Sequence, residues 1–482
     1  MIWWAYLAAL GLLAIYGVHR CSLIARYFLH RGAGSSGVLP RPDVLPMVTV
    51  QLPLYNERHV AVRLIEAVAG LDWPGDRLQI QVLDDSTDDT ARLCRNTIRR
   101  LRNAGVDIEH LHRIDRAGFK AGALEAGLAS ARGELVLVLD ADFLPPADLL
   151  RRTVGHFSDA RVGMVQVRWD HLNRDYSELT RVQALLLDGH FAIEQSVRAR
   201  TGKFFNFNGT AGLWRKQTIE AAGGWQHDTL TEDLDLSYRA LLVGWRFVYL
   251  LGVTAPAELP VEMNAFKSQQ YRWAKGSVQV ARKLLWRVLR SDLRWPVKVE
   301  AFFHLTQNVP YLITLVLALL AVPALALRDG HGLSESLAFD VPLCLATAGT
   351  LLLYCLTSQS AIGAGPLWRV ALRVPSLIAI TAGICVSQAR AVIEGLAGHQ
   401  SEFVRTPKHG IIERGREPGE VPQTPRYRGP RTLTPVAEIA MAIYFAGAIA
   451  YAADAGRYFA VPILAAFALG FGYVGTRSVL RT

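Results

Sequence analysis

Cysteine is scarce in this 482-residue chain, and two common nucleotide-binding motifs are missing. The five cysteines form no Cys-x-x-Cys pair, so the sequence indicates neither a disulfide framework nor a zinc site, and we expect the soluble part in a reducing compartment. No Gly-x-x-x-x-Gly-Lys-Ser/Thr is present, which argues against a P-loop ATPase. No Gly-x-Gly-x-x-Gly follows the first predicted strand, which argues against a dinucleotide-dependent oxidoreductase.

The N-terminal segment also lacks the basic stretch and the small-residue cleavage site of a secretory signal peptide. Its first apolar run is instead followed by Arg20, Arg26 and Arg31. We interpret residues 1–31 as a retained membrane anchor. The positive-inside rule then places the domain that follows this anchor in the cytoplasm.

Positive charge exceeds negative charge, with 52 Lys and Arg residues against 42 Asp and Glu residues. Such a balance fits either a nucleic acid or a membrane surface as partner. Because the basic residues cluster beside apolar runs, the sequence favours the membrane, and no nucleic-acid partner is predicted. Residues 279–300 alternate basic and apolar side chains around Trp286 and Trp295, which predicts an amphipathic helix in the membrane interface.

Apolar runs divide the rest of the chain into soluble and membrane parts. We expect a linker over 32–46, a cytoplasmic domain over 47–278, transmembrane or interfacial helices over 301–393, a cytoplasmic loop over 394–434 and a transmembrane hairpin over 435–482. The apolar run at 374–393 lies between two basic stretches, so we expect it to lie at or dip into the inner face. The sequence therefore predicts a multi-pass protein of the cell (inner or plasma) membrane.

Short β-rich runs alternate with amphipathic helical patterns in the soluble part. Strands are predicted near 47–53, 79–85 and 134–140, and helices near 59–69, 88–102 and 120–131. This alternation predicts an α/β fold with a doubly wound, mostly parallel sheet, inserted between an N-terminal transmembrane helix and a C-terminal helix bundle. Because such sheets bind ligands beyond the carboxyl ends of their strands, residues that follow the strands are the candidate site.

Two carboxylates, Asp140 and Asp142, close the third predicted strand. Alternate side chains of an extended segment point the same way, so these charges would repel unless a cation lay between them. A hard divalent ion such as Mg²⁺ or Mn²⁺, shared with substrate phosphate oxygens, would resolve the repulsion. Taken alone, the pair is more commonly explained as a loop or helix cap.

Two further acidic clusters occupy comparable positions. Asp84 and Asp85 close the second predicted strand, just before a helix that we expect Ser86, Thr87 or Asp88 to cap. A third cluster comprises Glu232, Asp233 and Asp235 in the first turn of a helix capped near Thr231, where acidic residues also complement the helix dipole. These three acidic sites could converge on one nucleoside diphosphate and its metal.

The stretch from Gln269 to Trp273 places an arginine beside a tryptophan. Arginine can neutralise a diphosphate with two parallel hydrogen bonds, and tryptophan can pack against a sugar ring. An ordinary Arg-Trp pair on an interfacial helix is the alternative explanation.

Together these motifs resemble those of the family 2 glycosyltransferases of the cellulose synthase superfamily. They are, in order, "LPLYNE", "VLDDSTDDT", "RAGFKAGAL", "LVLDADF", "FNGTAGLWR", "TEDLDLSYRALLVGWRFVYL" and "QQYRWAKG". The likeness covers about Val48 to Lys283 and is most similar to the plant cellulose-synthase-like A and C proteins, which make mannan and glucan backbones. The resemblance implies a GT-A-type glycosyltransferase domain and a divalent metal cofactor.

The resemblance also implies roles for particular residues. The catalytic base would be Asp233, with Glu232 beside it. The donor-binding residues would be Pro53, Tyr55, Glu57, Asp84, Asp85, Lys120, Asp140, Gln269 and Arg272. The acceptor-binding residues would be Trp273, Phe207, Asn208, Gly209 and Thr210. The metal ligands would be Asp140 and Asp142.

A further motif, "FVRTPK", is similar to the gating loop of bacterial cellulose synthase through Phe403, Thr406 and Lys408. Arg405 stands where that loop has a valine, which leaves open whether the loop closes over the nucleotide in the same way. A loop with this role must be cytoplasmic, which agrees with the basic charge of 394–434.

The leading hypothesis is an inverting glycosyltransferase. It would transfer a hexose from UDP-glucose or GDP-mannose to a growing β-glycan, processively and coupled to translocation. A first alternative is non-processive glycosylation of a membrane lipid; either way the acceptor is a glycan or is lipid-linked, and any partner subunit is left unidentified. A nucleotide-binding transporter or sensor is the alternative of another class, disfavoured because the apolar runs are nearly free of the ionisable groups that line substrate pathways.

Overall fold

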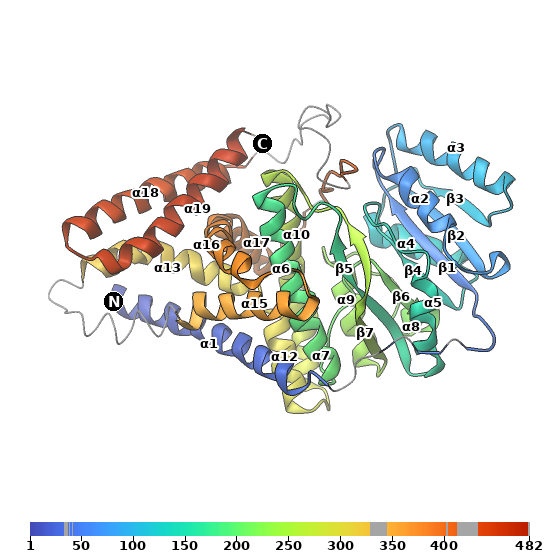
Figure 1. The fold of residues 1–482 in the computed structure, drawn as a ribbon, viewed down its shortest axis with the longest axis horizontal. Coiled ribbons are helices and arrows are strands. Elements are labelled where there is room, and N and C mark those ends of the chain that lie inside the picture. The colour runs from blue at the N-terminus through green and yellow to red at the C-terminus, as the bar shows by residue number, and fades with distance from the viewer. Residues whose placement is uncertain are drawn as a thin grey trace.

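A computed structural model describes residues 1–32, 37, 39–40, 42–327, 345–401, 403–411 and 432–480. Figure 1 shows an α/β domain at one end of the molecule and a bundle of helices at the other. Parts of the expected linker, of residues 301–393 and of the 394–434 loop fall into the gaps and lie outside the described residues.

The α/β domain is built on a seven-stranded sheet in the order β3-β2-β1-β4-β6-β5-β7. Strands β3, β2, β1 and β4 are parallel, β6 is antiparallel to both β4 and β5, and β5 is parallel to β7. The strands are β1 (Val48–Leu54), β2 (Leu78–Asp84), β3 (Ile108–His112), β4 (Leu135–Val138), β5 (Val162–His171), β6 (Gly212–Arg215) and β7 (Arg246–Ala257). The prediction of an α/β fold with a mostly parallel sheet is confirmed.

Helices cover both faces of this sheet. Buried residues of α2 (Ala61–Ala69) and α3 (Thr90–Asn103) pack on one face, and those of α4 (Phe119–Ser130) pack on the other. Helix α4 approaches the sheet closely at Gly127, where a Cβ atom would lie 2.6 Å from the Gln51 side-chain nitrogen. This doubly wound packing leaves the carboxyl ends of the parallel strands open for a ligand.

The other helices of the domain lie between and after the later strands. They are η1 (Gly75–Arg77), α5 (Leu149–Thr153), η2 (Val154–Ser158), α6 (Glu178–Gly189), η3 (His190–Gln195), α7 (Ser196–Arg200), α8 (Lys216–Ala221), α9 (Glu232–Leu242) and α10 (Met263–Val280). Figure 1 shows α6 and α10 on the side of the sheet that faces the bundle.

Two of the predicted caps differ from the contacts observed. Helix α9 begins just after Thr231, but among the described residues the Thr231 hydroxyl has no hydrogen-bond partner, so it does not cap the helix. At the start of α3, the Asp88 carboxylate accepts the Thr90 N–H at 2.9 Å. The Ser86 hydroxyl accepts the Asn56 N–H at 2.9 Å, from the loop after β1, instead of capping α3.

The stretch 279–300, predicted as a single interfacial helix, is divided between two helices. Helix α10 continues through η4 (Ala281–Leu285) into α11 (Trp286–Arg290), and α12 (Trp295–Leu305) starts anew after a turn. Proline in the first turn of α12 suits such a restart, because the N–H that proline lacks would have no helical partner there.

The bundle combines the N-terminal helix with the C-terminal part of the chain. Its helices are α1 (Ile2–Leu29), α13 (Val309–Ala326), η5 (Leu345–Gly349), α15 (Thr350–Ile362), α16 (Leu367–Gly383), α17 (Cys385–Ala397), α18 (Thr434–Asp454), η6 (Tyr458–Ala460) and α19 (Val461–Leu480). Four of them, α1, α13, α18 and α19, are long and apolar enough to cross a membrane. Helices α16 and α17 meet at a bend of 47°, so the pair is either a fifth, broken span or a re-entrant segment. The predicted dip of 374–393 into the inner face corresponds to the re-entrant arrangement, whereas a broken span would contradict it, so the dip stays a prediction.

Candidate active site

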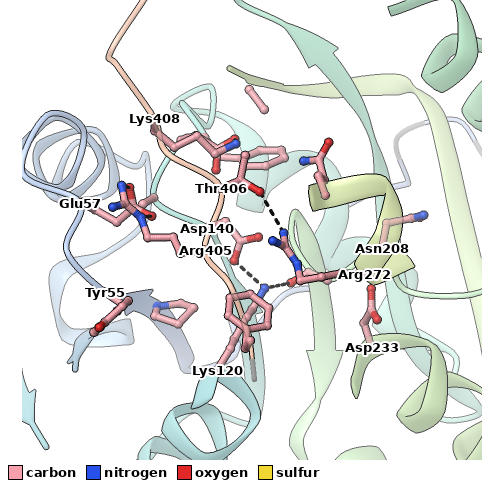
Figure 2. Close-up of a pocket in the computed structure, with 18 of the residues that line it drawn as sticks. Tyr55, Glu57, Lys120, Asp140, Asn208, Asp233, Arg272, Arg405, Thr406 and Lys408 are labelled. Atoms are coloured by element: carbon pink, nitrogen blue, oxygen red, sulfur yellow. Dashed lines mark hydrogen bonds and ion pairs between the residues drawn. The ribbon is translucent and has the colours of Figure 1, made fainter. Parts of the chain in front are cut away.

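A cavity of about 200 Å³ lies at the carboxyl ends of the strands, between the sheet and α10. Segment 403–408 crosses it, and Figure 2 shows this segment running between Glu57 on one side and Arg272 on the other. The cavity draws its lining from β1, α4, the loop after β4, α9, α10 and this segment, which are far apart in the chain.

Most of the predicted site residues line this cavity. They are Pro53, Tyr55, Glu57, Asp85, Lys120, Asp140, Asp142, Asn208, Gly209, Glu232, Asp233, Gln269, Arg272, Trp273, Phe403, Thr406 and Lys408. Residues separated by up to about 350 positions in the chain therefore share one enclosed space, which is the juxtaposition that a nucleotide-sugar site requires.

Three predicted site residues do not line the cavity. Asp84 is fully buried and faces the β3 edge, where its carboxylate lies 2.9 Å from the His110 imidazole. Phe207 is buried in the core against Trp214. The Thr210 hydroxyl accepts the Asp140 N–H at 2.9 Å and so supports the loop from behind. Direct contact of these three side chains with donor or acceptor is not supported by their positions.

The two carboxylates after β4 are each paired with a lysine. The Lys120 ammonium donates to Asp140 at 2.5 Å, and the Lys408 ammonium donates to Asp142 at 2.6 Å. Enclosure in the cavity raises the pKa of Asp140 despite the opposing charge of Lys120. Although burial lowers the pKa of the Lys408 ammonium group, the charge and hydrogen bond of Asp142 together with the charges of Glu258 and Glu57 outweigh it, so that pKa is raised.

This pair of carboxylates fits a hard divalent cation. The Asp142 charge lies close enough to help raise the pKa of Asp140, and two such neighbouring carboxylates form the oxygen-rich environment that Mg²⁺ and Mn²⁺ prefer. The lysine ammonium groups supply the positive charge that a metal would otherwise provide.

Asp233 lies at the start of α9, at the inner end of the cavity. Its side chain points toward Gly209, where an added Cβ atom would lie 3.1 Å from the Asp233 carboxylate. Burial, reinforced by the neighbouring Glu232 carboxylate, raises the pKa of Asp233 to about 7. A carboxyl with a pKa near neutrality can both accept and release a proton, which suits a general base.

The arginine of α10 connects the cavity to segment 403–408. Arg272 donates to the Val404 carbonyl and, at 3.0 Å, to the Thr406 hydroxyl, and it lies over the Phe403 ring. Trp273, the next residue, packs near Trp169 with ring centroids 6.5 Å apart. Arg272 of α10 thus holds segment 403–408 in place, while the next residue, Trp273, lines the inner end of the cavity.

Sequence reasoning missed Glu258 and did not foresee that Glu57, predicted to bind the donor, also holds the same segment. Arg405 donates two hydrogen bonds to Glu57, at 2.8 and 2.6 Å, and Glu258 accepts the N–H groups of His409 and Gly410, both at 2.8 Å. Burial raises the pKa of Glu57 to about 7, although Arg405 opposes the change. The sequence did offer one signal, because Arg405 stands where the similar gating loop has a valine. The carboxylate that pairs with Arg405 could be identified only from the fold.

The opposite end of the cavity carries groups suited to a nucleoside. The Arg116 guanidinium lies 3.4 Å from the centre of the Tyr55 ring, which is a cation–π contact. Asp85 lines the cavity and is held by Arg113 through two hydrogen bonds, at 2.8 and 2.6 Å. A planar base could stack against such a surface while the carboxylate accepted its N–H groups.

A second cavity of about 1100 Å³ begins at the inner end of the first and continues into the helix bundle. The residues that line both cavities are Trp169, Leu187, Asn208, Thr231, Asp233, Gln269 and Trp273. The second cavity is lined further on by residues of α1, α13, α15, α16 and α19. A space that leads away from Asp233 in this way could hold an acceptor chain.

Comparisons with known proteins agree with this arrangement. The family model described as "Glycosyltransferase like family 2" matches residues 46–276. Glucomannan 4-beta-mannosyltransferase 1 of Cyamopsis tetragonoloba is 34% identical over 455 residues, covering 91% of this chain and 84% of that protein. Glucomannan 4-beta-mannosyltransferase 1 of Oryza sativa subsp. japonica is 41% identical over 293 residues, covering 58% of this chain and 56% of that protein.

Among solved structures, the mannosyltransferase PcManGT from Pyrobaculum calidifontis, in complex with GDP-Man and Mn²⁺, shares the fold. Its TM-score is 0.54 at 21% identity, and the match covers 75% of this chain and 99% of that one. The fold and the cavity thus define a GT-A-like glycosyltransferase joined to apolar helices. The chain belongs to glycosyltransferase family 2 and is a multi-pass membrane enzyme, so the alternative of a transporter or sensor that only binds nucleotides is wrong.

Proposed function

We propose that this enzyme transfers mannose from GDP-mannose to the end of a β-linked mannan or glucomannan chain, with inversion at the anomeric carbon. Its relatives, which match up to 91% of this chain, are named as mannosyltransferases, which supports mannose over glucose as the transferred sugar. The observation that carries the proposal is the placement of Asp233 where the donor cavity meets the cavity leading into the bundle.

In this mechanism Asp233 takes the proton of the acceptor hydroxyl as that oxygen attacks the anomeric carbon in a single displacement. Trp273 and Asn208 line the same junction and would hold the acceptor sugar against Asp233. On the donor side, Lys120 and Arg272 line the cavity and would balance the charge that develops on the departing diphosphate.

Asp140 and Asp142 would hold the divalent cation. When bound there, that cation would add positive charge beside the diphosphate oxygens. The Asp142 carboxylate oxygen that accepts from Lys408 becomes available to the cation only when Lys408 moves away. We therefore expect segment 403–408 to shift when donor and metal enter. Glu57 and Glu258 remain as anchors that can return the segment afterwards.

The second cavity suggests where the product goes. It leads from Asp233 into the helix bundle, so a growing chain could be threaded through the membrane as it is made, with the catalytic domain on the cytoplasmic side. A second candidate, glycosylation of a membrane lipid, is favoured by one observation. Much of the lining that the bundle helices give this cavity is apolar, including Leu317, Ala321, Ile463 and Phe467.

The experiment that tests the proposal supplies membranes containing the enzyme with radiolabelled GDP-mannose or UDP-glucose, with and without Mn²⁺. We expect a polymer from GDP-mannose that a β-mannanase degrades. Label recovered only in a single-sugar lipid would support the second candidate, and incorporation from UDP-glucose alone would contradict the donor assignment.

The role of Asp233 is tested with Asp233→Asn, which keeps the shape of the side chain but removes its basicity. General base catalysis contributes about a hundred- to ten-thousand-fold, so turnover is expected to fall by that factor. Asp175→Asn, which alters a largely exposed aspartate outside both cavities, is the matched control. Parent-level transfer by the Asp233→Asn enzyme would remove Asp233 from this role.

A further inference from the structure

A short π-helix lies directly beside the junction of the two cavities. Helix α6 continues as the π-helical segment η3 (His190–Gln195) before α7 begins. Turns of this kind are rare and often occur at functional sites. Two side chains from η3, those of His190 and Gln195, contact Asn208, and His190 itself lines the cavity that leads into the bundle.

The contacts of Gln195 determine how the Asn208 amide is oriented. The Gln195 side-chain nitrogen donates to the Asn206 backbone carbonyl at 3.0 Å and to the Asn208 side-chain oxygen at 2.6 Å. A backbone carbonyl can only accept, so Gln195 must present its nitrogen there. Asn208 must therefore turn its oxygen toward Gln195 and its nitrogen toward His190.

The contacts of His190 continue this series of hydrogen bonds and are consistent with the same orientation of the Asn208 amide. The Asn208 side-chain nitrogen donates to His190 Nε2 at 2.9 Å, so the ring proton must lie on Nδ1, which is 3.1 Å from a Glu194 carboxylate oxygen. Although burial raises the pKa of Glu194, the hydrogen bond from His190 and the charge of Arg198 hold that pKa well below its usual range. Glu194 thus stays ionised and keeps the ring proton on Nδ1.

The second N–H of the Asn208 amide has no acceptor among the described residues, and Asn208 lines the junction next to Asp233. Figure 2 shows Asn208 and Asp233 on the same side of the first cavity. If the Asn208 amide is prevented from rotating, this second N–H stays directed at one place, where an oxygen of the acceptor sugar can accept it. Because the amide is already ordered before the acceptor binds, less conformational entropy is lost on binding, and the acceptor binds more tightly.

We propose that His190 is a positioning residue for the acceptor, acting through Asn208. It holds the amide so that one N–H points to the terminal sugars of the acceptor glycan, whose hydroxyl Asp233 deprotonates. This inference rests on the proposed function, because it takes a β-linked glycan as the acceptor. It assigns acceptor recognition, rather than chemistry, to η3.

The test measures acceptor binding without turnover. Enzyme carrying Asp233→Asn in lipid nanodiscs is titrated with β-1,4-mannohexaose, and GDP-mannose binding is measured in parallel. His190→Phe keeps a similar ring volume but removes the acceptor for the Asn208 amide, and we expect mannohexaose to bind about 3- to 10-fold more weakly, the worth of one hydrogen bond. GDP-mannose affinity and the unfolding temperature should stay unchanged.

His190→Gln is the conservative variant. The oxygen of a glutamine amide can accept from Asn208 while its nitrogen donates to Glu194, so most of the lost affinity should return. His399→Phe, at an exposed histidine that lines neither cavity, is the control for the change of residue type. Unchanged mannohexaose affinity in His190→Phe would overturn the proposal, and so would equal losses in the Phe and Gln variants or a parallel loss of GDP-mannose binding.

Titration with cellohexaose separates this inference from the proposed function. If the parent binds cellohexaose and not mannohexaose, the mannan assignment fails, and the His190 variants are judged on cellohexaose by the same criteria. If the parent binds neither oligosaccharide, the role of His190 in acceptor binding fails together with the glycan acceptor.

Discussion

The ion pair between Lys408 and Asp142 leads to a quantitative prediction about metal binding. The two side chains meet at 2.6 Å, and each is only 10% exposed. A divalent cation needs the same Asp142 oxygens, so Lys408 competes with the metal whenever segment 403–408 is closed. Replacing Lys408 by methionine keeps much of the side-chain length and removes this competitor.

The size of the effect follows from the contact that is lost. A hydrogen bond between charged groups contributes about 1.5–3 kcal/mol, which corresponds to about a 10- to 100-fold change in affinity. Lys408→Met should therefore bind Mn²⁺ more tightly by about that factor in the absence of donor. Arg405 and Glu258 still anchor the segment, so the change should report Asp142 rather than loss of the whole loop.

Electron paramagnetic resonance of free Mn²⁺ measures this affinity directly, without turnover. Lys298→Met removes one positive charge from a residue that lines neither cavity, and it controls for long-range electrostatics. In an Asp142→Asn background the advantage of Lys408→Met should disappear, since the shared ligand is gone. Mn²⁺ affinity within twofold of the parent, or weaker than the parent, would refute the competition.

Two further predictions concern pH and packing. Because burial and Glu232 raise the pKa of Asp233 to about 7, and the base must be unprotonated, kcat/KM should fall as pH decreases through about 7 and level off above it; a pH-rate profile with no break near neutrality would contradict this. Gly127→Ala places a methyl group 2.6 Å from the Gln51 nitrogen and 2.7 Å from a Leu83 methyl carbon, and it should lower the free energy of unfolding by about 1–3 kcal/mol. Gly75→Ala, where no heavy atom lies within 4 Å of the added carbon, should leave thermal unfolding unchanged.

Local pattern was sufficient for β1, β2 and β4 and for the helices α2, α3 and α4, whereas β3, β5, β6 and β7 were not predicted. Strands such as β4 are apolar and buried along their length, and a helix such as α2 carries one apolar face, so these elements were placed from the sequence within a few residues. The division of 279–300 was missed, because basic and apolar residues alternate on both sides of the turn at 291–294 and only Pro296 marks the restart.

The two aspartates at the end of β2, Asp84 and Asp85, show where local pattern stops being informative. Adjacent residues of an extended segment point to opposite faces, so only one of Asp84 and Asp85 could line the cavity. Which one does so depends on the neighbours. Arg113 draws Asp85 to the cavity side, while His110 and the Ser86 N–H hold Asp84 at the buried edge.

The sequence by itself determined the α/β class, the apolar helices and most of the side chains that line the cavity, because strand alternation and short motifs depend on neighbours within a few residues. Only the tertiary structure decided what those side chains meet. Arg405 reaches Glu57 across 348 positions, Lys408 reaches Asp142 across 266, and η3 fixes the amide of Asn208. Such pairings depend on how distant segments pack, and no local pattern of charge or hydrophobicity specifies them.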